Sequence, residues 1–109
     1  MSRTLKLIGD YRRDSIFNLE LSEYTGAISL IRLGDHRNSL IGDEEQLFFD
    51  KTHQRALAFS SGRHCVRLLQ KYFSLCKTEV RHGVYGPIWF GEFLGSISHS
   101  NKLACATLF

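Results

Sequence analysis

The chain has 109 residues, of which 43% are hydrophobic and 12% aromatic, so it is long enough for one domain with a modest core and too short for two. Its net charge is +3, and its basic residues are scattered along the sequence except for the pair Arg12-Arg13. So small and diffuse an excess of positive charge argues against a nucleic-acid-binding surface. The three cysteines form no CxxC pair, and no stretch resembles a signal peptide or a membrane span. We therefore expect a single cytoplasmic domain over residues 1–109, with reduced thiols and no membrane association.

The first predicted element is a β-strand over residues 26–33. This stretch, "GAISLIRL", is rich in β-branched and aliphatic residues and ends at Gly34-Asp35, a typical turn. The preceding segment, "SIFNLELSEY", alternates apolar and polar residues, which is compatible with either a strand or an extended arm.

Two helices are predicted next. Asp43 can cap a first helix, and Glu44 and Glu45 follow it where the helix dipole favours acidic side chains. A second helix, roughly residues 54–73, follows a break near residues 51–52. Its apolar residues recur at steps of three and four and comprise Phe59, Gly62, Cys65, Val66, Leu69 and Phe73. Ser60, Ser61 and Gly62 weaken its middle, and the glycine suggests close approach of another backbone or a ligand.

The remaining chain predicts short strands between glycines. One lies around residues 88–89, and "GSISHS" and "KLACATLF" form a hairpin around a turn at residues 100–102. Within it, Ile97 and His99 share one face of the strand, and Ser96, Ser98 and Ser100 share the other. The predicted fold class is α+β, with a helical pair packed on a small, mainly antiparallel sheet.

The Ser98-His99 pair is the first candidate site. A hydrolase would require the second glycine of a G-x-S-x-G elbow, which this sequence lacks, and adjacent strand residues point to opposite faces. A polar strand end with a solvated histidine is the alternative. The five histidines and three cysteines show neither i,i+4 nor CxxC spacing, so we expect no zinc site.

Phosphate binding is the second possibility. The sequence has neither a GxxxxGK[ST] loop nor a GxGxxG motif. Arg55 and Arg63, eight residues apart, have similar azimuths on a helix, and with Ser98 and His99 they would make good phosphate donors if the fold brings them together. The sequence leaves open the alternative of two arginines on a solvated helix face.

Two segments in sequence resemble a known family. "RALAFSSGRHCVRLL" (residues 55–69), with an F-x-x-G-R motif at Phe59 to Arg63, precedes "GPIWFGEFLGSISHSNKLACATL" (residues 86–108). Together they resemble the amino-terminal half of 4'-phosphopantetheinyl transferases of the enterobactin-synthetase type. The resemblance covers Asp43 to Leu108, and it implies half of a pseudo-two-fold transferase fold.

This resemblance implies coenzyme A (CoA) as ligand and substrate, and an acyl or peptidyl carrier protein as partner, in siderophore, fatty acid or polyketide biosynthesis. It assigns Ser98 and His99 to phosphate contact, and Arg63, with Arg55, to the nucleotide phosphates. Three positions depart from the family pattern and remove charge or stiffness that would help to hold the ligand. They are Ala56, Tyr85 and Phe90.

The family also uses Mg²⁺, held by a D-x-E pair in the second half of the transferase together with a catalytic glutamate and lysine. Here the D-x-E pattern occurs at Asp43-Glu44-Glu45, at a helix start far along the chain from the Ser-His strand. No metal or catalytic residue is therefore assigned, and we expect this chain alone not to catalyse the transfer.

Three hypotheses follow from the resemblance. The chain is the truncated amino-terminal half of a transferase, or a half completed by a second chain, or a non-catalytic CoA-binding or regulatory module. Because an isolated half would expose an apolar face, we expect a homodimer or a complementing second half.

Overall fold

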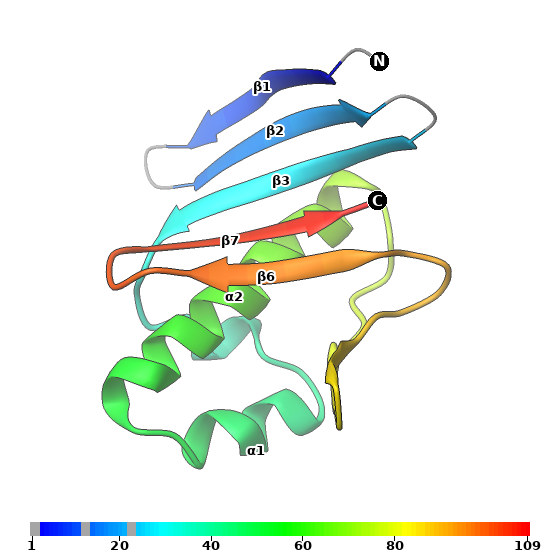
Figure 1. The fold of residues 1–109 in the computed structure, drawn as a ribbon. Coiled ribbons are helices and arrows are strands. Elements are labelled where there is room, and N and C mark those ends of the chain that lie inside the picture. The colour runs from blue at the N-terminus through cyan, green and yellow to red at the C-terminus, as the bar shows by residue number, and fades with distance from the viewer. Residues whose placement is uncertain (1–2, 12–13, 22–23) are drawn as a thin grey trace.

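The structure is a computed structural model that describes residues 3–11, 14–21 and 24–109; Arg12-Arg13 lie outside the described residues. The chain forms an antiparallel five-stranded sheet with one long helix across a face (Figure 1). The sheet has the strand order β1-β2-β3-β7-β6, built from β1 (Arg3–Tyr11), β2 (Asp14–Leu21), β3 (Tyr24–Arg32), β7 (Leu103–Leu108) and β6 (Gly95–His99).

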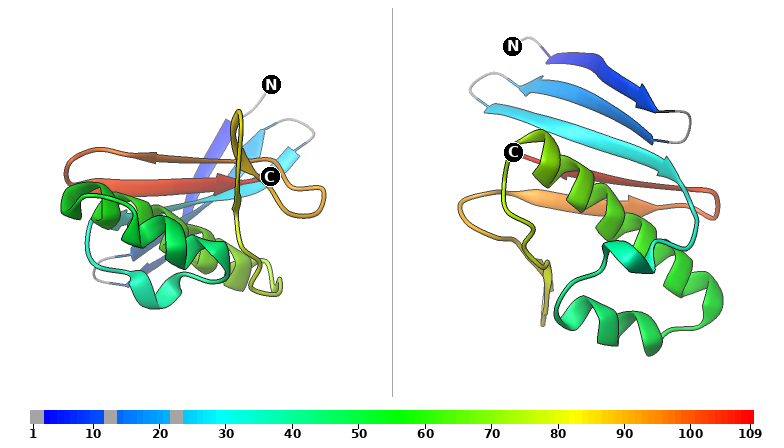
Figure 2. Two further views of the ribbon diagram at one scale, coloured as in Figure 1. Left: turned by 90° about the horizontal axis from the view of Figure 1, so that it is seen from below. Right: turned by 180° about the vertical axis from the view of Figure 1, so that it is seen from behind.

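Along the chain, two helices and a short 3₁₀ turn follow β3. They are η1 (Arg37–Ser39), α1 (Asp43–Phe49) and α2 (His53–Tyr72). A two-stranded ribbon, β4 (Arg81–Gly83) and β5 (Gly86–Ile88), follows α2 and projects away from the main sheet (Figure 2). The α+β prediction is confirmed, with α2 as the helix that covers the sheet.

The local predictions agree with these elements. Both helices and the β6–β7 hairpin lie where the sequence predicted them, within a residue or two at each end. The segment before β3 is a strand rather than an extended arm. Strand β1 was not predicted, and its register against β2 shifts between Leu7 and Gly9, so the alternation is interrupted there. Within the described residues, no helix is long and apolar enough to cross a membrane.

The main core lies between α2 and the sheet. From α2, the side chains of Cys65, Val66 and Leu69 are completely buried. They pack with small and aliphatic side chains of β3 and β7, chiefly Ala27, Ile31, Ala104, Ala106 and Leu108. The amphipathic period of α2 is therefore explained by burial of one stripe against the sheet.

The predicted close approach at Gly62 is made by the edge strand. A Cβ atom added at Gly62 would lie 2.6 Å from Cγ2 of Ile97, closer than real carbon atoms approach. Strand β6 and helix α2 are thus in direct contact, which requires glycine at this position.

Ser60 and Ser61 are buried within an unbroken helix, so the predicted weak middle of α2 does not interrupt it. Ser61 Oγ accepts a hydrogen bond from the Gly34 amide at 3.0 Å and donates to the Gly34 carbonyl at 3.0 Å. Ser60 Oγ accepts from the His36 amide at 3.1 Å. These hydroxyls hold the loop after β3 against α2.

Candidate functional site

The sequence-predicted site residues lie on two elements that the fold brings together. Arg55 and Arg63 belong to α2, and Ser98 and His99 are the last two residues of β6. The helix contacts the strand at Gly62, which lies against Ile97. Arg63 is the next residue of the helix. The long-range juxtaposition of helix and strand that a common site requires is therefore present.

Ser98 and His99 are both exposed but lie on different faces of the sheet. Ile97 faces α2, so strand alternation puts His99 on the helix side and Ser98 on the opposite side. Ser96, which shares the face of Ser98, bonds the hydroxyl of Thr107 at 2.8 Å. A single ligand can contact both Ser98 and His99 only by crossing the end of β6.

Arg63 is the most unusual of the candidate residues. It is only 6% exposed, and its guanidinium carbon lies 4.5 Å from the ring centroid of Phe59. Its Nε lies 3.9 Å from Oε2 of Glu44 and has no hydrogen-bond partner. Burial lowers the pKa of Arg63, because desolvation penalises the charged form. This side chain is a buried positive charge with an unused donor.

Arg55, by contrast, is exposed in the first turn of α2. The two arginines therefore occupy different environments, although their spacing gives them similar azimuths. The alternative of two arginines on a solvated helix face holds for Arg55 and is wrong for Arg63.

The carboxylate of Glu44 organises the buried side of this region. Glu44 is 1% exposed, and its two oxygens accept hydrogen bonds from Nη2 of Arg67, one of them at 2.7 Å. The same carboxylate accepts from the amide of Val80 at 2.7 Å and from that of Ile41 at 3.1 Å. One side chain thus joins α1, α2, the loop before α1 and the residue before β4.

The remaining donors of Arg67 are also used internally. Nε donates to the Ser39 carbonyl at 3.1 Å, and Nη1 donates to Gln70 Oε1 at 2.7 Å and to the Thr78 carbonyl. Arg63 and Arg67 therefore share one carboxylate, that of Glu44, which leaves one excess positive charge in the buried network. An excess charge of this kind favours a nearby anion.

Sequence reasoning placed Glu44 at the helix start, where the dipole favours acidic side chains, and did not predict this network. One signal was present: Glu44 is four residues before Phe48, so both lie on one helix face, and both are buried. No local pattern identifies Arg67 and Val80 as the partners of Glu44.

The positions that depart from the family pattern have structural explanations. Ala56 is buried beside Leu40 and Phe48, where an arginine would have to displace apolar contacts. Phe90 packs against Trp89 and Phe93, with ring centroids 6.2 and 5.8 Å away. Tyr85, in the turn between β4 and β5, is fully exposed.

The described acidic, histidine and cysteine side chains are scattered over the fold. In the described part of the chain, no group of three or more His, Cys, Asp or Glu residues is arranged to hold a metal ion. Of the Asp43-Glu44-Glu45 triplet, the central carboxylate is occupied by Arg67 and the two flanking residues are exposed. These residues do not fit the Mg²⁺ site that the family resemblance implies.

The fold and this charge distribution define a small α+β domain in which an arginine-bearing helix lies against a strand that ends in Ser-His. Residues 43–108 match the family model described as the 4'-phosphopantetheinyl transferase N-terminal domain, and the chain belongs to this family. Comparisons with curated proteins and with solved structures gave no match. The match has the bounds that the two sequence motifs predicted, so the resemblance is confirmed at the level of the family.

Proposed function

We propose that this chain binds CoA through its phosphate groups, as the nucleotide-binding side of a phosphopantetheinyl transferase of the enterobactin-synthetase type. The buried guanidinium of Arg63 is the observation that carries the proposal. Its Nε has no hydrogen-bond partner, and its nearest carboxylate is shared with Arg67. A phosphate bound close to this side chain would supply the counter-charge that the protein itself does not provide.

The four candidate residues take different roles in this proposal. Arg63 binds the 3'-phosphate from the helix. Arg55 is exposed and adds positive charge about two helical turns away on a similar face of α2. His99 and Ser98 contact phosphates at the end of β6, each from its own side of the strand. The chain thereby binds and orients the nucleotide.

The transfer step itself requires further groups. In the family reaction, a serine hydroxyl of an acyl or peptidyl carrier protein attacks the pyrophosphate of CoA, and Mg²⁺ neutralises the developing charge. The described residues do not form that metal site, so the proposed role of this chain is to bind the nucleotide. The purified chain should leave apo carrier protein unmodified, as measured by mass spectrometry.

A half that is completed by a second chain is the second candidate. The turn between β4 and β5 exposes two large apolar side chains, those of Val84 (92% exposed) and Tyr85, and Ile88 beside them is 53% exposed. Exposed apolar side chains that cluster on a projecting ribbon are typical of a contact surface.

Calorimetric or ligand-observed NMR titrations with CoA and dephospho-CoA test the CoA proposal. Charge-assisted hydrogen bonds contribute about 1.5 to 3 kcal/mol each. With a few such contacts, we expect a CoA dissociation constant on the order of 0.1 to 1 mM, and about tenfold weaker binding of dephospho-CoA.

Arg63→Ala should abolish the preference for CoA over dephospho-CoA. Arg37→Ala is the matched control, because Arg37 is an exposed arginine paired with Asp35 and its removal changes the net charge equally. Equal binding of the two ligands by the wild-type chain, or an unchanged preference in Arg63→Ala, would overturn the assignment.

A further inference from the structure

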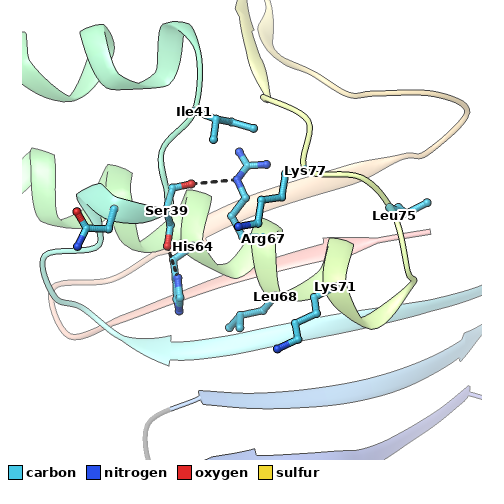
Figure 3. A pocket seen from close by; sticks show the side chains of 9 residues that line it. Ser39, Ile41, His64, Arg67, Leu68, Lys71, Leu75 and Lys77 are labelled. Atoms are coloured by element: carbon cyan, nitrogen blue, oxygen red, sulfur yellow. Dashed lines mark hydrogen bonds between the residues drawn. The ribbon is translucent and has the colours of Figure 1, made fainter.

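A pocket of about 340 Å³ lies beside the carboxyl-terminal half of α2 (Figure 3). None of the residues proposed to bind CoA lines it. Its walls come from three segments: the η1 region, α2, and the loop that follows α2. This volume is within the range of small-molecule sites in proteins.

The lining of this pocket is cationic. Lys71 of α2 and Lys77 of the following loop line it together with Arg67, and none of the residues that line it is an aspartate or glutamate. Both lysines are exposed, and within the described part of the chain neither forms an ion pair. For a chain with a net charge of only +3, this is a strong local concentration of positive charge.

Charge from the protein interior adds to this field. Arg67 borders the pocket, but all its donor nitrogens bond to protein acceptors, so it contributes charge rather than free donors. Its counter-ion, Glu44, is shared with Arg63, which leaves excess positive charge behind the pocket wall. The two lysines are therefore the groups available to bind an anion.

The polar wall is held in one geometry. Ser39 Oγ and His64 Nδ1 are 2.6 Å apart, and the His64 ring stacks on His36 with centroids 4.1 Å apart. The Ser39 carbonyl is fixed by Arg67. A site with fixed walls loses less conformational entropy when a ligand binds.

Three aliphatic residues, Ile41, Leu68 and Leu75, and the amide side chain of Asn38 complete the lining. Figure 3 shows the three aliphatic side chains on different sides of the lysines and Arg67, so a compact apolar group beside a lysine-bound phosphate can reach one of them. A ligand that satisfies both kinds of surface has a doubly charged anionic group and a compact apolar group. We propose that this pocket binds a phosphomonoester, with its phosphate on Lys71 and Lys77 and its apolar group against the aliphatic residues.

An NMR titration of the full chain with phenyl phosphate, inorganic phosphate and benzoate tests this site. We expect shifts of the backbone amides of Ser39, Lys71 and Lys77, with a phenyl phosphate dissociation constant on the order of 1 mM. Inorganic phosphate lacks the apolar group and benzoate lacks the second charge, so each should bind about fivefold or more weakly. Benzoate or inorganic phosphate binding as tightly as phenyl phosphate would contradict the phosphomonoester assignment.

The double variant Lys71→Ala/Lys77→Ala should weaken phenyl phosphate binding about tenfold or more. Arg81→Ala/Lys102→Ala removes the same charge from exposed positions outside the pocket and should bind within twofold of wild type. Undiminished binding by the first variant would overturn the proposal, as would shifts confined to Ser98 and His99.

The two proposed sites can be separated. Arg63→Ala should lose the preference for CoA, and because Arg63 adds field but does not line the pocket, it should weaken phenyl phosphate binding much less than Lys71→Ala/Lys77→Ala does; the lysine variant should retain the preference for CoA. Failure of one proposal therefore leaves the other to be judged on its own result.

Discussion

Replacement of Glu44 by glutamine should destabilise this protein severely. The carboxylate is 1% exposed, and it is the only acidic group that the structure places against the guanidinium groups of Arg63 and Arg67 among the described residues. Glu44→Gln preserves the size of the side chain and removes its charge. Two buried cations are then left without a counter-ion.

The expected magnitude follows from that loss. Removing one partner of a buried ion pair typically costs about 3 to 5 kcal/mol, because the remaining charge stays desolvated. The amide oxygen of glutamine can still accept a bond from Val80 or Ile41, but its amide group opposes the guanidinium of Arg67. Since small domains are stable by about 5 to 15 kcal/mol, this loss is a large fraction of the total.

Urea unfolding followed by circular dichroism measures this effect. With a denaturant slope of about 1 to 3 kcal/mol/M, the midpoint should fall by about 1 to 5 M. Glu45→Gln is the matched control, because Glu45 is the next residue of the same helix and is exposed, and its cost should stay below about 1 kcal/mol. Similar midpoints for the two variants would refute the conclusion that Glu44 neutralises the buried arginines.

Three further predictions concern other parts of the molecule. Gly62→Ala should destabilise the fold by about 1 to 3 kcal/mol, because the new Cβ would lie 2.6 Å from Ile97. In an Ile97→Ala background the same change should cost less. Denaturant midpoints of the wild type, the two single variants and the double variant check this. The side-chain hydrogen bonds from Arg37 lower the pKa of Asp35, so the stability from this pair is present above the ordinary pKa of aspartate and is lost as the pH falls through the lowered value. A carbon-13 NMR titration should show that Arg37→Ala raises the pKa of Asp35 toward its ordinary value, while the backbone amide of residue 37 still lowers it; an unchanged titration would contradict the assignment. Finally, the chain should self-associate through the β4–β5 ribbon, and Tyr85→Ser should weaken the association; light scattering that shows a monomer at high concentration would count against it.

Local patterns in the sequence were sufficient for most of the elements. The steps of three and four residues that include Cys65 and Leu69 predicted α2, because Cys65, Val66 and Leu69 are buried in the core against the sheet. The turn residues 100–102 predicted the β6–β7 hairpin, in which Ser100 Oγ accepts bonds from the amides of Lys102 and Leu103. Strand β1 was missed because its alternation breaks between Leu7 and Gly9.

The sequence by itself also determined the family, since two motifs with the correct residues in the correct order do not depend on the fold for their recognition. It identified Arg63 and the Ser98-His99 pair as candidates for phosphate contact. Strand alternation in the sequence also put Ser98 and His99 on different faces, which agrees with β6. The structure decided that Arg63 is buried and partly uncompensated.

The environment of each charge was decided by tertiary structure alone. Glu44, Arg67 and Val80 are far apart in sequence, and only the packing of α1 and the segment before β4 against α2 brings them together. The same packing brings Lys77 to the pocket that Lys71 lines from the helix. The periodicity of a sequence shows which face of a helix or strand is buried. It does not show which distant residue packs against that face. The free energy of a buried charge depends on this distant partner, so only the tertiary structure determines it.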